Sequence, residues 1–530
     1  MQYPRPQAMH SYPNQPACDE PASLNSTLGG NSPHHHHRPT ANPTTIKMAT
    51  STPENKNRAR RTGRKAATVA KPQRDLLFDE LGDALVEQLY ADPKLNDDLA
   101  PDNPHRNLYT VLTAFDAKPP TSLHIPNDRQ NGMAFIPATP EDNPPPLGSK
   151  FRPIKSKTMQ HPNISTLADL STMATIELLA ARYGQVAHMG ILDRSYRFFV
   201  NKARTAALSF KVLNRVAIVG GDPLCDVAAI PDLVAEFAEY RRWFGWGVAF
   251  LGASESFMQG YAAPQGWTTV RFGTERVLNP LTNEVLLERG GKRITVQNRR
   301  LLHPRKGGIT LGMYTPATHG TNQPLQTDLA AIYDAWCAHR NNSATPQTFI
   351  TVYDLFALPA LMTFIYTRGP DGRPNGFAAL RRLGVGRYHL DPCISTPGSP
   401  KGISDLLLVT AMAILHRVGA SYLGFGFEPL HVLLPGHING MPRPLAGLTS
   451  TLYGHIFHRL SICGKKAYHD KFYPDLIQDS GLYLLFPAGV PGPLDLLAMA
   501  HMANISLRKI IWADVRFWNF KRRVKGELTR

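Results

Sequence analysis

The segment GKKAYHDKFYP spans Gly464–Pro474 and precedes a strand-like run, Leu482–Phe486. It gathers basic and aromatic side chains: Lys465, Lys466, His469 and Lys471 with Tyr468, Phe472 and Tyr473. Cations beside aromatic rings suit a site that holds a phosphate backbone while it stacks a base or a ribose. The alternative, on local composition alone, is a charged turn that leads into an edge strand.

The rest of the chain is also basic. Its 530 residues carry a formal net charge of +17 and have a pI of about 9.7. This charge favours a polyanionic partner (RNA, DNA or an anionic membrane surface) over a neutral metabolite. The length allows two or three domains, and 42% hydrophobic residues are enough for a sizeable core.

Cysteine usage and hydropathy narrow the class of protein. The cysteines are scattered and include no CxxC pair: Cys18, Cys225, Cys337, Cys393 and Cys463. This argues against a disulfide scaffold or a zinc site, and it fits a reducing compartment. The adjacent His34–His37 lack a scaffold, so we predict no metal site. No run of about 18 apolar residues occurs, so we expect membrane contact to be peripheral.

Composition shifts along the chain predict five regions. Residues 1–75 are a disordered, basic, low-complexity region, in which Lys56–Lys71 is a nucleic-acid or acidic-lipid arm, a nuclear signal, or a solvating linker. Residues 76–165 contain a docking helix, patterned over Asp75–Tyr90, and a Pro-rich linker. Two domains follow at 166–325 and 326–490, and 491–530 form a basic amphipathic helix, patterned over Leu494–Phe520.

The two central regions share one order of elements. Strands at Tyr196–Val200, Ala206–Leu213 and Val216–Val219 precede a helix at Ile230–Trp243 and a strand at Val248–Leu251. The order recurs with strands at Ala360–Tyr366, Asn375–Leu383 and Tyr388–Pro392, a helix at Ile403–Val418 and a strand at Ser421–Phe425. The sequence therefore predicts an α/β (α+β) fold of tandem acetyltransferase-like (GNAT) domains around one cleft.

Seven segments, in this order, carry a family resemblance: Ala181–Leu192, Asp193–Phe199, Val219–Cys225, Gly291–Gly308, Ser399–Val409, Leu423–Leu430 and Gly464–Pro487. Together they resemble the aminoacyl-tRNA-dependent transferase domain of the bacterial phosphatidylglycerol lysyltransferases. The resemblance implies two acetyltransferase-like domains that move an amino acid from aminoacyl-tRNA to a lipid hydroxyl. In the last segment, Ala467 and His469 replace an arginine and a lysine of the bacterial pattern.

The chain is most similar to freestanding fungal members of this family, which make ergosteryl-glycine, because residues 1–165 contain nothing like a synthetase. The resemblance implies glycyl-tRNA as co-substrate, no other cofactor, and the 3β-hydroxyl of ergosterol as acceptor. It also implies tRNA, a sterol-containing membrane surface and a separate synthetase as partners, at a cytoplasmic, peripherally membrane-associated location. The oligomeric state is not predicted.

Three other functions stay open. They are aminoacyl transfer to phosphatidylglycerol, acyl-CoA-dependent N-acyl transfer on the same fold, and non-catalytic binding of RNA or membranes. The stretch Pro397–Gly402 lacks the full pyrophosphate loop of acetyltransferases, which disfavours acetyl-CoA. Gly220–Asp222 predict a tight turn, whose amides either bind an anion or serve the turn alone.

The candidate site residues form three groups. For catalysis we predict Asp405 to orient the aminoacyl amine, Lys471 to hold the 3′-terminal phosphates or the oxyanion, and Glu428 to tune amino-acid choice. The alternatives are a helix-start carboxylate, a solvated lysine and a surface change. For tRNA binding we predict Arg299, Arg300, Arg305, Lys306, Lys465, Lys466, His469 and Tyr468, with a solvated helix end as the alternative for the arginines. For membrane contact we predict Trp512, Phe517, Trp518 and Lys521, with helix packing as the alternative.

Overall fold

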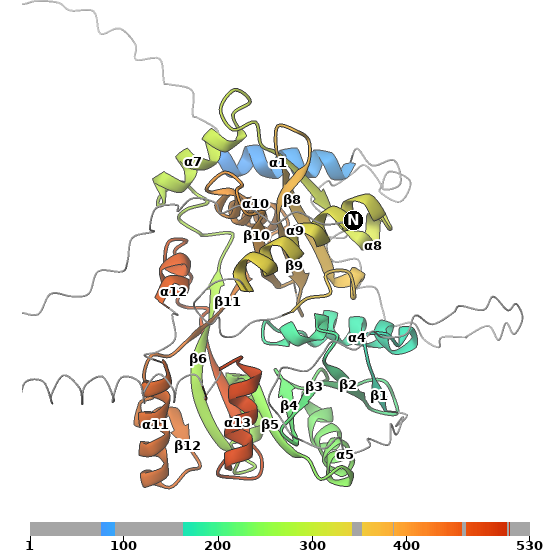
Figure 1. Ribbon diagram of the computed structural model, residues 1–530, viewed down its shortest axis with the longest axis vertical. Coiled ribbons are helices and arrows are strands. Elements are labelled where there is room, and N and C mark those ends of the chain that lie inside the picture. Colours follow the sequence, from blue (N-terminus) through green and yellow to red (C-terminus); the bar gives the residue numbers. More distant parts are fainter. Residues whose placement is uncertain are drawn as a thin grey trace, which may run out of the picture. The chain divides into compact units, whose positions relative to one another are not determined.

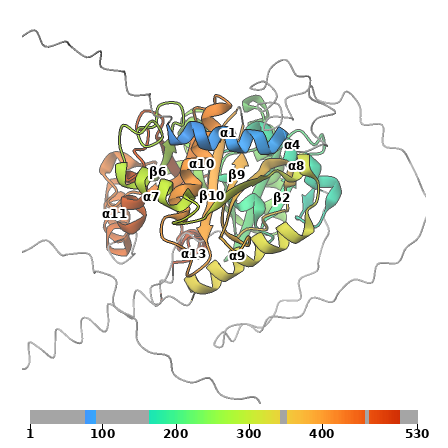
Figure 2. The same ribbon diagram turned by 90° about the horizontal axis from the view of Figure 1, so that it is seen from above.

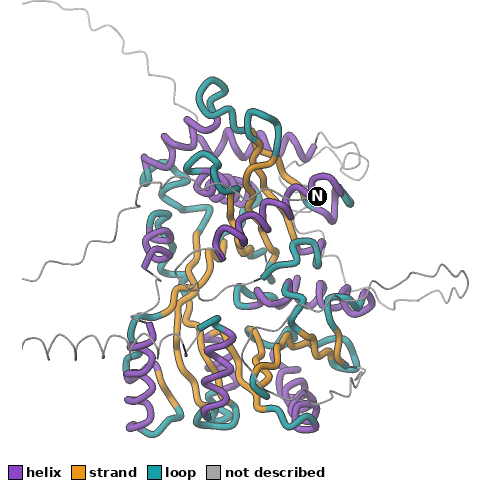
Figure 3. The backbone as a smooth tube through the Cα atoms, viewed as in Figure 1, coloured by secondary structure: helices purple, strands orange, loops and turns teal. Residues whose placement is uncertain are grey.

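The computed structural model describes residues 76–90, 163–341, 352–384, 386–457, 463–505 and 508. Within these ranges, one mixed sheet has helices packed against it (Figures 1 and 3). Its strands are β1 (Ile164–Ser165), β2 (Arg197–Val200), β3 (Ala207–Leu213), β4 (Val216–Gly220), β5 (Gly247–Ser254), β6 (Thr268–Leu278), β7 (Thr310–Tyr314), β8 (Met362–Arg368), β9 (Pro374–Arg382), β10 (Tyr388–Ser395), β11 (Leu423–Pro429), β12 (Ile438–Asn439) and β13 (Ser480–Phe486).

The helices of the same ranges are α1 (Leu77–Tyr90), α4 (Leu170–Tyr183), α5 (Ile230–Trp243), α6 (Glu255–Phe257), α7 (Lys292–Leu302), α8 (Pro316–His319), α9 (Gln323–Asn341), α10 (Ile403–Arg417), α11 (Arg443–Phe457), α12 (Cys463–Asp470) and α13 (Pro493–Met502). The short helix α6 continues as a π-helical turn at Met258–Ala262. The helix predicted over Asp75–Tyr90 is present as α1.

The predicted repeat of elements is confirmed. β2, β3 and β4 form an antiparallel meander, α5 follows, and β5 returns parallel to β4. β8, β9 and β10 form a second meander, α10 follows, and β11 returns parallel to β10. The α/β fold class is therefore as predicted, while the domain boundaries stay a prediction.

Two strands join the repeats into a continuous sheet. β6 pairs with β11 on one side and with β13 on the other, and β13 also pairs with β5. The run Leu482–Phe486 thus lies inside the sheet, so the alternative of an edge strand is wrong. The alternative of a charged turn before it is also wrong in part, because Cys463–Asp470 form the helix α12.

Helix α10 lies at the centre of the second repeat. Its leucines, valine, alanines and methionine are buried against β8, β9 and β10, with α1 and α7 on its other side. Helix α9 packs against the opposite face of the same strands, since alternate residues of β9 point to opposite cores. Figure 2 shows α1 and α10 on one side of β9 and β10, and α9 on the other. The buried α10 gives the side chains of its first turn a fixed position.

The described part of the helix predicted over Leu494–Phe520 is not continuous. α13 ends at Met502, where Asn504 adopts a left-handed φ of 55° that suits a helix terminus. The predicted membrane residues Trp512, Phe517, Trp518 and Lys521 lie outside the described residues. Within the described part of the chain, no helix has the length and apolar content to cross a membrane.

Candidate functional site

The structure brings two of the predicted catalytic residues into direct contact. Asp405 lies in the first turn of α10, and Lys471 follows the last residue of α12. The ammonium Nζ of Lys471 lies 2.6 Å from Oδ1 and 2.5 Å from Oδ2 of Asp405. The pairing of residues 66 positions apart could not be read from either motif alone.

Aromatic side chains surround this ion pair. The Lys471 Nζ lies 5.1 Å from the ring centroids of both Tyr468 and Phe472, within the range of cation–π attraction. Phe425 of β11 contacts the same two rings, and Phe472 is fully buried. The charges therefore meet beside a low-dielectric wall, where electrostatic interactions are stronger than in water.

Two protonated neighbours complete this centre. Burial raises the pKa of the Tyr468 hydroxyl, and the nearby Cys393 and Asp405 raise it further. Burial, followed by the charge of Asp405, also raises the pKa of the Cys393 thiol, which donates to the Ser404 carbonyl at 3.4 Å. Both groups are neutral near pH 7. Sequence reasoning missed Cys393, which was only one of several scattered cysteines.

Glu428 belongs to a second ionic network, on β11. Its carboxylate lies 3.2 Å from Lys466 Nζ and 3.6 Å from Arg276 Nε, and Arg276 also pairs with Asp470 and Asp479. The hydrogen bond that Lys466 donates to Glu428 is the main cause that raises the pKa of Lys466. Glu428 is thus engaged by two cations. Arg276 and Asp479 carried no signal in the sequence.

The remaining residues of α12 divide between surface and core. His469 is buried, with its ring 4.7 Å from that of Phe425, and Tyr468 packs against the core as described above. Lys466 is half-exposed in the Glu428 network. The side chain of Lys465 lies outside the described residues. Packing therefore accounts for the buried His469 and for the part of Tyr468 that contacts the core, and the tRNA role of both residues stays a prediction.

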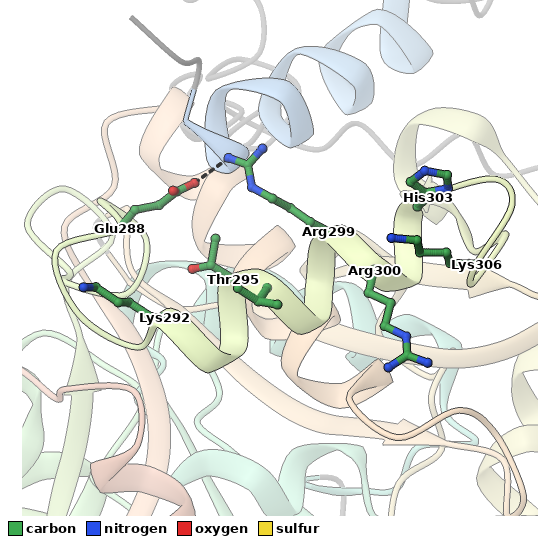
Figure 4. Close-up of a pocket in the computed structure, with 8 residues that line it drawn as sticks. Glu288, Lys292, Thr295, Arg299, Arg300, His303 and Lys306 are labelled. Carbon is green, nitrogen blue, oxygen red and sulfur yellow. Dashed lines mark hydrogen bonds and ion pairs between the residues drawn. The ribbon is translucent and has the colours of Figure 1, made fainter.

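The predicted arginine cluster lines a pocket on α7. The cavity has a volume of about 810 Å³ and is lined by Glu288, Lys292, Thr295, Val296, Arg299, Arg300, His303 and Lys306. Figure 4 shows these side chains on α7 and on the segments before and after it, with Arg299 pointing toward Glu288. Arg305 lies in the turn after α7, where its amide donates to His303 Nδ1.

Arg299 is held in place, whereas two other cations of the pocket are not. Arg299 pairs with Glu288 at 2.8 Å and with Glu80 of α1 at 3.5 Å. Among the described residues, neither Arg300 nor Lys306 forms an ion pair with a carboxylate. The pocket therefore keeps excess positive charge, which suits a phosphate group.

The pocket and the Asp405–Lys471 pair meet at the start of α10. Gln297 of α7 donates to the Lys401 carbonyl at 2.8 Å, one residue before the N-cap, Gly402. α7 thus holds the turn that positions Asp405. A ligand bound at α7 would lie next to the element that carries the ion pair.

The Gly220–Asp222 turn has a structural role. The Gly221 amide donates to the Leu251 carbonyl, so it is not available to an anion. The Asp222 carboxylate accepts hydrogen bonds from Gln185 and from Ser254. The turn therefore fixes the junction of β4 and β5.

Comparisons with known proteins agree with the sequence resemblance. A family model described as phosphatidylglycerol lysyltransferase, C-terminal, matches residues 177–483. An MprF-like domain protein of Mycobacterium tuberculosis is 26% identical over 241 residues, which cover 44% of this chain and 48% of that protein. The lysylphosphatidylglycerol biosynthesis bifunctional protein LysX of Rhodococcus jostii is 23% identical over 222 residues, covering 42% and 19%. The chain thus spans half or less of these relatives.

The solved structures to which the chain is similar include the C-terminal domain of a putative lysylphosphatidylglycerol synthetase from Agrobacterium fabrum. It is 20% identical, with a TM-score of 0.49, and the match covers 64% of this chain and 98% of that one. L-PGS from Bacillus licheniformis is 19% identical, with a TM-score of 0.48 and coverage of 64% and 97%.

Proposed function

The chain belongs to the family described as phosphatidylglycerol lysyltransferase, C-terminal, and from this premise we propose that it transfers an amino acid from aminoacyl-tRNA to a lipid hydroxyl. The observation that carries the proposal is the contact between Asp405 and Lys471, because it joins two charged side chains of separate sequence segments at one place beside an apolar wall. The relatives' names give the acceptor class, and this chain's own acceptor is part of the proposal.

The reaction needs no covalent enzyme intermediate. An aminoacyl-tRNA ester is already activated, so the enzyme must align the reactants, help remove the hydroxyl proton and stabilise the oxyanion. The lipid oxygen bonds to the ester carbonyl carbon, the bond from that carbon to the ribose oxygen breaks, and the hydroxyl proton passes to the ribose oxygen. The neutral Cys393 and Tyr468 support this direct route, since neither is poised as an anionic nucleophile.

Asp405 and Lys471 can each exchange their mutual contact for a substrate group. The Asp405 carboxylate binds the α-ammonium of the aminoacyl group and so orients the ester. The Lys471 ammonium donates to the developing oxyanion or steadies the acceptor end. Glu428, held by Lys466 and Arg276, shapes the neighbouring wall and tunes the choice of amino acid.

The α7 pocket is the proposed contact for the tRNA backbone. Arg299, Arg300 and Lys306 line it, and Arg305 lies in the adjoining turn. Arginine and lysine bind phosphate through charge-assisted hydrogen bonds. The half-exposed Lys466 of α12 is a further candidate contact, whereas His469 is buried and Tyr468 is partly buried against the core.

The finer assignment is glycine from glycyl-tRNA to the 3β-hydroxyl of ergosterol, with a separate synthetase supplying the tRNA. It rests on the resemblance to freestanding fungal members of the family. A sterol hydroxyl lies at the membrane interface, so the transferase would work there as a peripheral protein. Phosphatidylglycerol is the second candidate acceptor, because the family description itself names that lipid.

A reconstituted reaction tests the proposal. The full chain is mixed with labelled glycine, tRNA, glycyl-tRNA synthetase, ATP and vesicles that contain both ergosterol and phosphatidylglycerol. We expect an alkali-labile label on the sterol. This label should be absent without the chain, and absent when RNase destroys the tRNA before the reaction starts. Label on phosphatidylglycerol alone would show that this lipid, and not ergosterol, is the acceptor, and would still support aminoacyl transfer to a lipid. Label that still reaches the sterol after RNase has destroyed the tRNA would contradict tRNA dependence.

A further inference from the structure

One helix turns its leucines to solvent. Leu445, Leu448 and Leu452 recur at helical spacing along one face of α11, and they are 43%, 56% and 49% exposed. The loop before the helix adds the exposed Val432 and Leu434. Single exposed apolar residues are ordinary, but a contiguous stripe marks an interaction face.

The inner face of α11 is held by polar groups. The Ser450 hydroxyl donates to the Leu433 carbonyl at 2.6 Å, and the Tyr453 hydroxyl lies 2.7 Å from the Leu430 carbonyl. Tyr453 stacks on the buried Phe457. The inner face also packs Ala446, Tyr453 and Phe457 against the core, so the outward leucines form a second apolar face on the same helix. The leucine stripe therefore serves something other than folding.

The charge around α11 fits an anionic or zwitterionic surface. From Pro429 to His469 the sequence contains no Asp or Glu, although it contains four Arg or Lys side chains and several histidines. One of these cations, Arg443, lies exposed at the first residue of α11. Leucines next to the exposed Arg443, in a stretch of sequence without carboxylates, match the boundary between lipid headgroups and acyl chains.

We propose that α11 is a membrane-docking face, in which Leu445, Leu448 and Leu452 enter the interface of a bilayer and Arg443 lies at the level of the lipid phosphates. The inference rests on the proposed transfer to a lipid, and it names the surface that brings the protein to that lipid.

The sheet places this face near the ion pair. β12, directly before α11, pairs with β6 at Val270, and β11, which contacts α12, pairs with β6 at Thr274. Four residues of strand span about 13 Å. The strand before α11 and the strand that contacts α12 therefore pair with neighbouring stretches of β6.

Vesicle flotation of the full chain tests the proposal without any transfer reaction. The variant Leu445→Gln/Leu448→Gln/Leu452→Gln is compared with Val227→Gln/Leu476→Gln/Ile477→Gln, which changes apolar residues that are 77%, 72% and 94% exposed elsewhere. Vesicles of phosphatidylcholine, phosphatidylserine and ergosterol are the probe. We expect the α11 variant to partition roughly a hundredfold less and the control to stay within about twofold. Unchanged denaturation midpoints show that both variants fold.

Transfer assays separate this inference from the proposed function. We expect the α11 variant to lose transfer to vesicle-borne lipid but to keep transfer to the same lipid in detergent micelles. Wild-type vesicle binding by the folded α11 variant would overturn the docking face, even if transfer is confirmed. The docking face would also be overturned if the leucine substitutions convert a dimer to monomers and leave vesicle binding unchanged. Leucine-dependent vesicle binding without any transfer would support the face and contradict the proposed function.

Discussion

At the scale of single residues, the account depends on the Lys471–Asp405 ion pair. Each partner is partly buried beside Tyr468 and Phe472, so neither charge is well solvated without the other. We expect Lys471→Ala and Asp405→Asn each to lower kcat/KM for transfer by about a hundredfold or more. The double variant should be little worse than the poorer single one, because the two groups act as a unit.

The matched control for this pair is Lys401→Ala, which removes an exposed cation close to α10. We expect near-normal kinetics from it. Near-normal transfer by a folded Lys471→Ala protein would remove Lys471 from the site.

A second residue-scale prediction concerns pH. Burial raises the pKa of the Glu275 carboxyl to about 7, although Arg387 lowers it, and its Oε1 accepts a hydrogen bond from Tyr422. The folded protein therefore keeps Glu275 protonated up to about pH 7, whereas the unfolded chain loses this proton near the usual carboxyl pKa of about 4.5. The stability of the folded protein therefore falls as the pH rises from about 4.5 to 7. Relative to Glu275→Gln, the wild type should lose about 2.5 kcal/mol of unfolding free energy between pH 5 and pH 8.

Denaturant unfolding of both proteins at the two pH values measures this difference, since other groups titrate alike in both. A difference that does not change with pH would show that Glu275 is ionised throughout.

At the scale of elements, the start of α10 sets the position of Asp405. Gly402 has a φ of 97°, and a Cβ there would lie 2.8 Å from Cγ of Gln297. We expect Gly402→Ala to lower stability by about 1–3 kcal/mol and to reduce transfer as Asp405 shifts. Gly398→Ala is the matched control, because Gly398 has a φ of 89° but no atom within 4 Å of the added Cβ. Equal losses of transfer in both variants would contradict the positioning role of the Gln297 contact.

Helix α7 carries the prediction for tRNA binding. Arg300→Ala/Lys306→Ala should weaken tRNA binding and reduce the slope of log affinity against log salt by about 2, because two phosphate contacts are lost. Lys202→Ala/Arg242→Ala removes the same charge from exposed positions elsewhere and should leave the slope almost unchanged. Equal effects of the two pairs would indicate a response to net charge rather than a site at α7.

Local pattern predicted most elements and missed those set by distant partners. The two meanders and the helices over Ile230–Trp243 and Ile403–Val418 were predicted, because hydrophobic periodicity is a local property. No helix was predicted at α12, for which a charged turn was the alternative interpretation, since its short sequence is rich in charge. The exposed leucine stripe of α11 was not predicted, because the sequence does not show which face of the helix packs against the core.

At the scale of the whole molecule, the sheet assembles the site from far-apart segments. β13, late in the sequence, inserts between β5 and β6, and β6 joins the two repeats. Such pairings leave no periodic signal, so sequence alone supplied Asp405 and Lys471 but neither their contact nor the roles of Cys393 and Arg276. The family resemblance supplied the function class, and the structure supplied the geometry that makes it testable.

The most direct test of the central claim is single-turnover transfer from purified aminoacyl-tRNA. Total tRNA charged with radiolabelled amino acids is mixed with the wild type or Lys471→Ala and with vesicles that contain ergosterol and phosphatidylglycerol. The account predicts label in the lipid fraction as an ester with the wild type, at least about a hundredfold less with the folded variant, and none after RNase. No lipid label from the folded wild type, or equal label from both proteins, would contradict it.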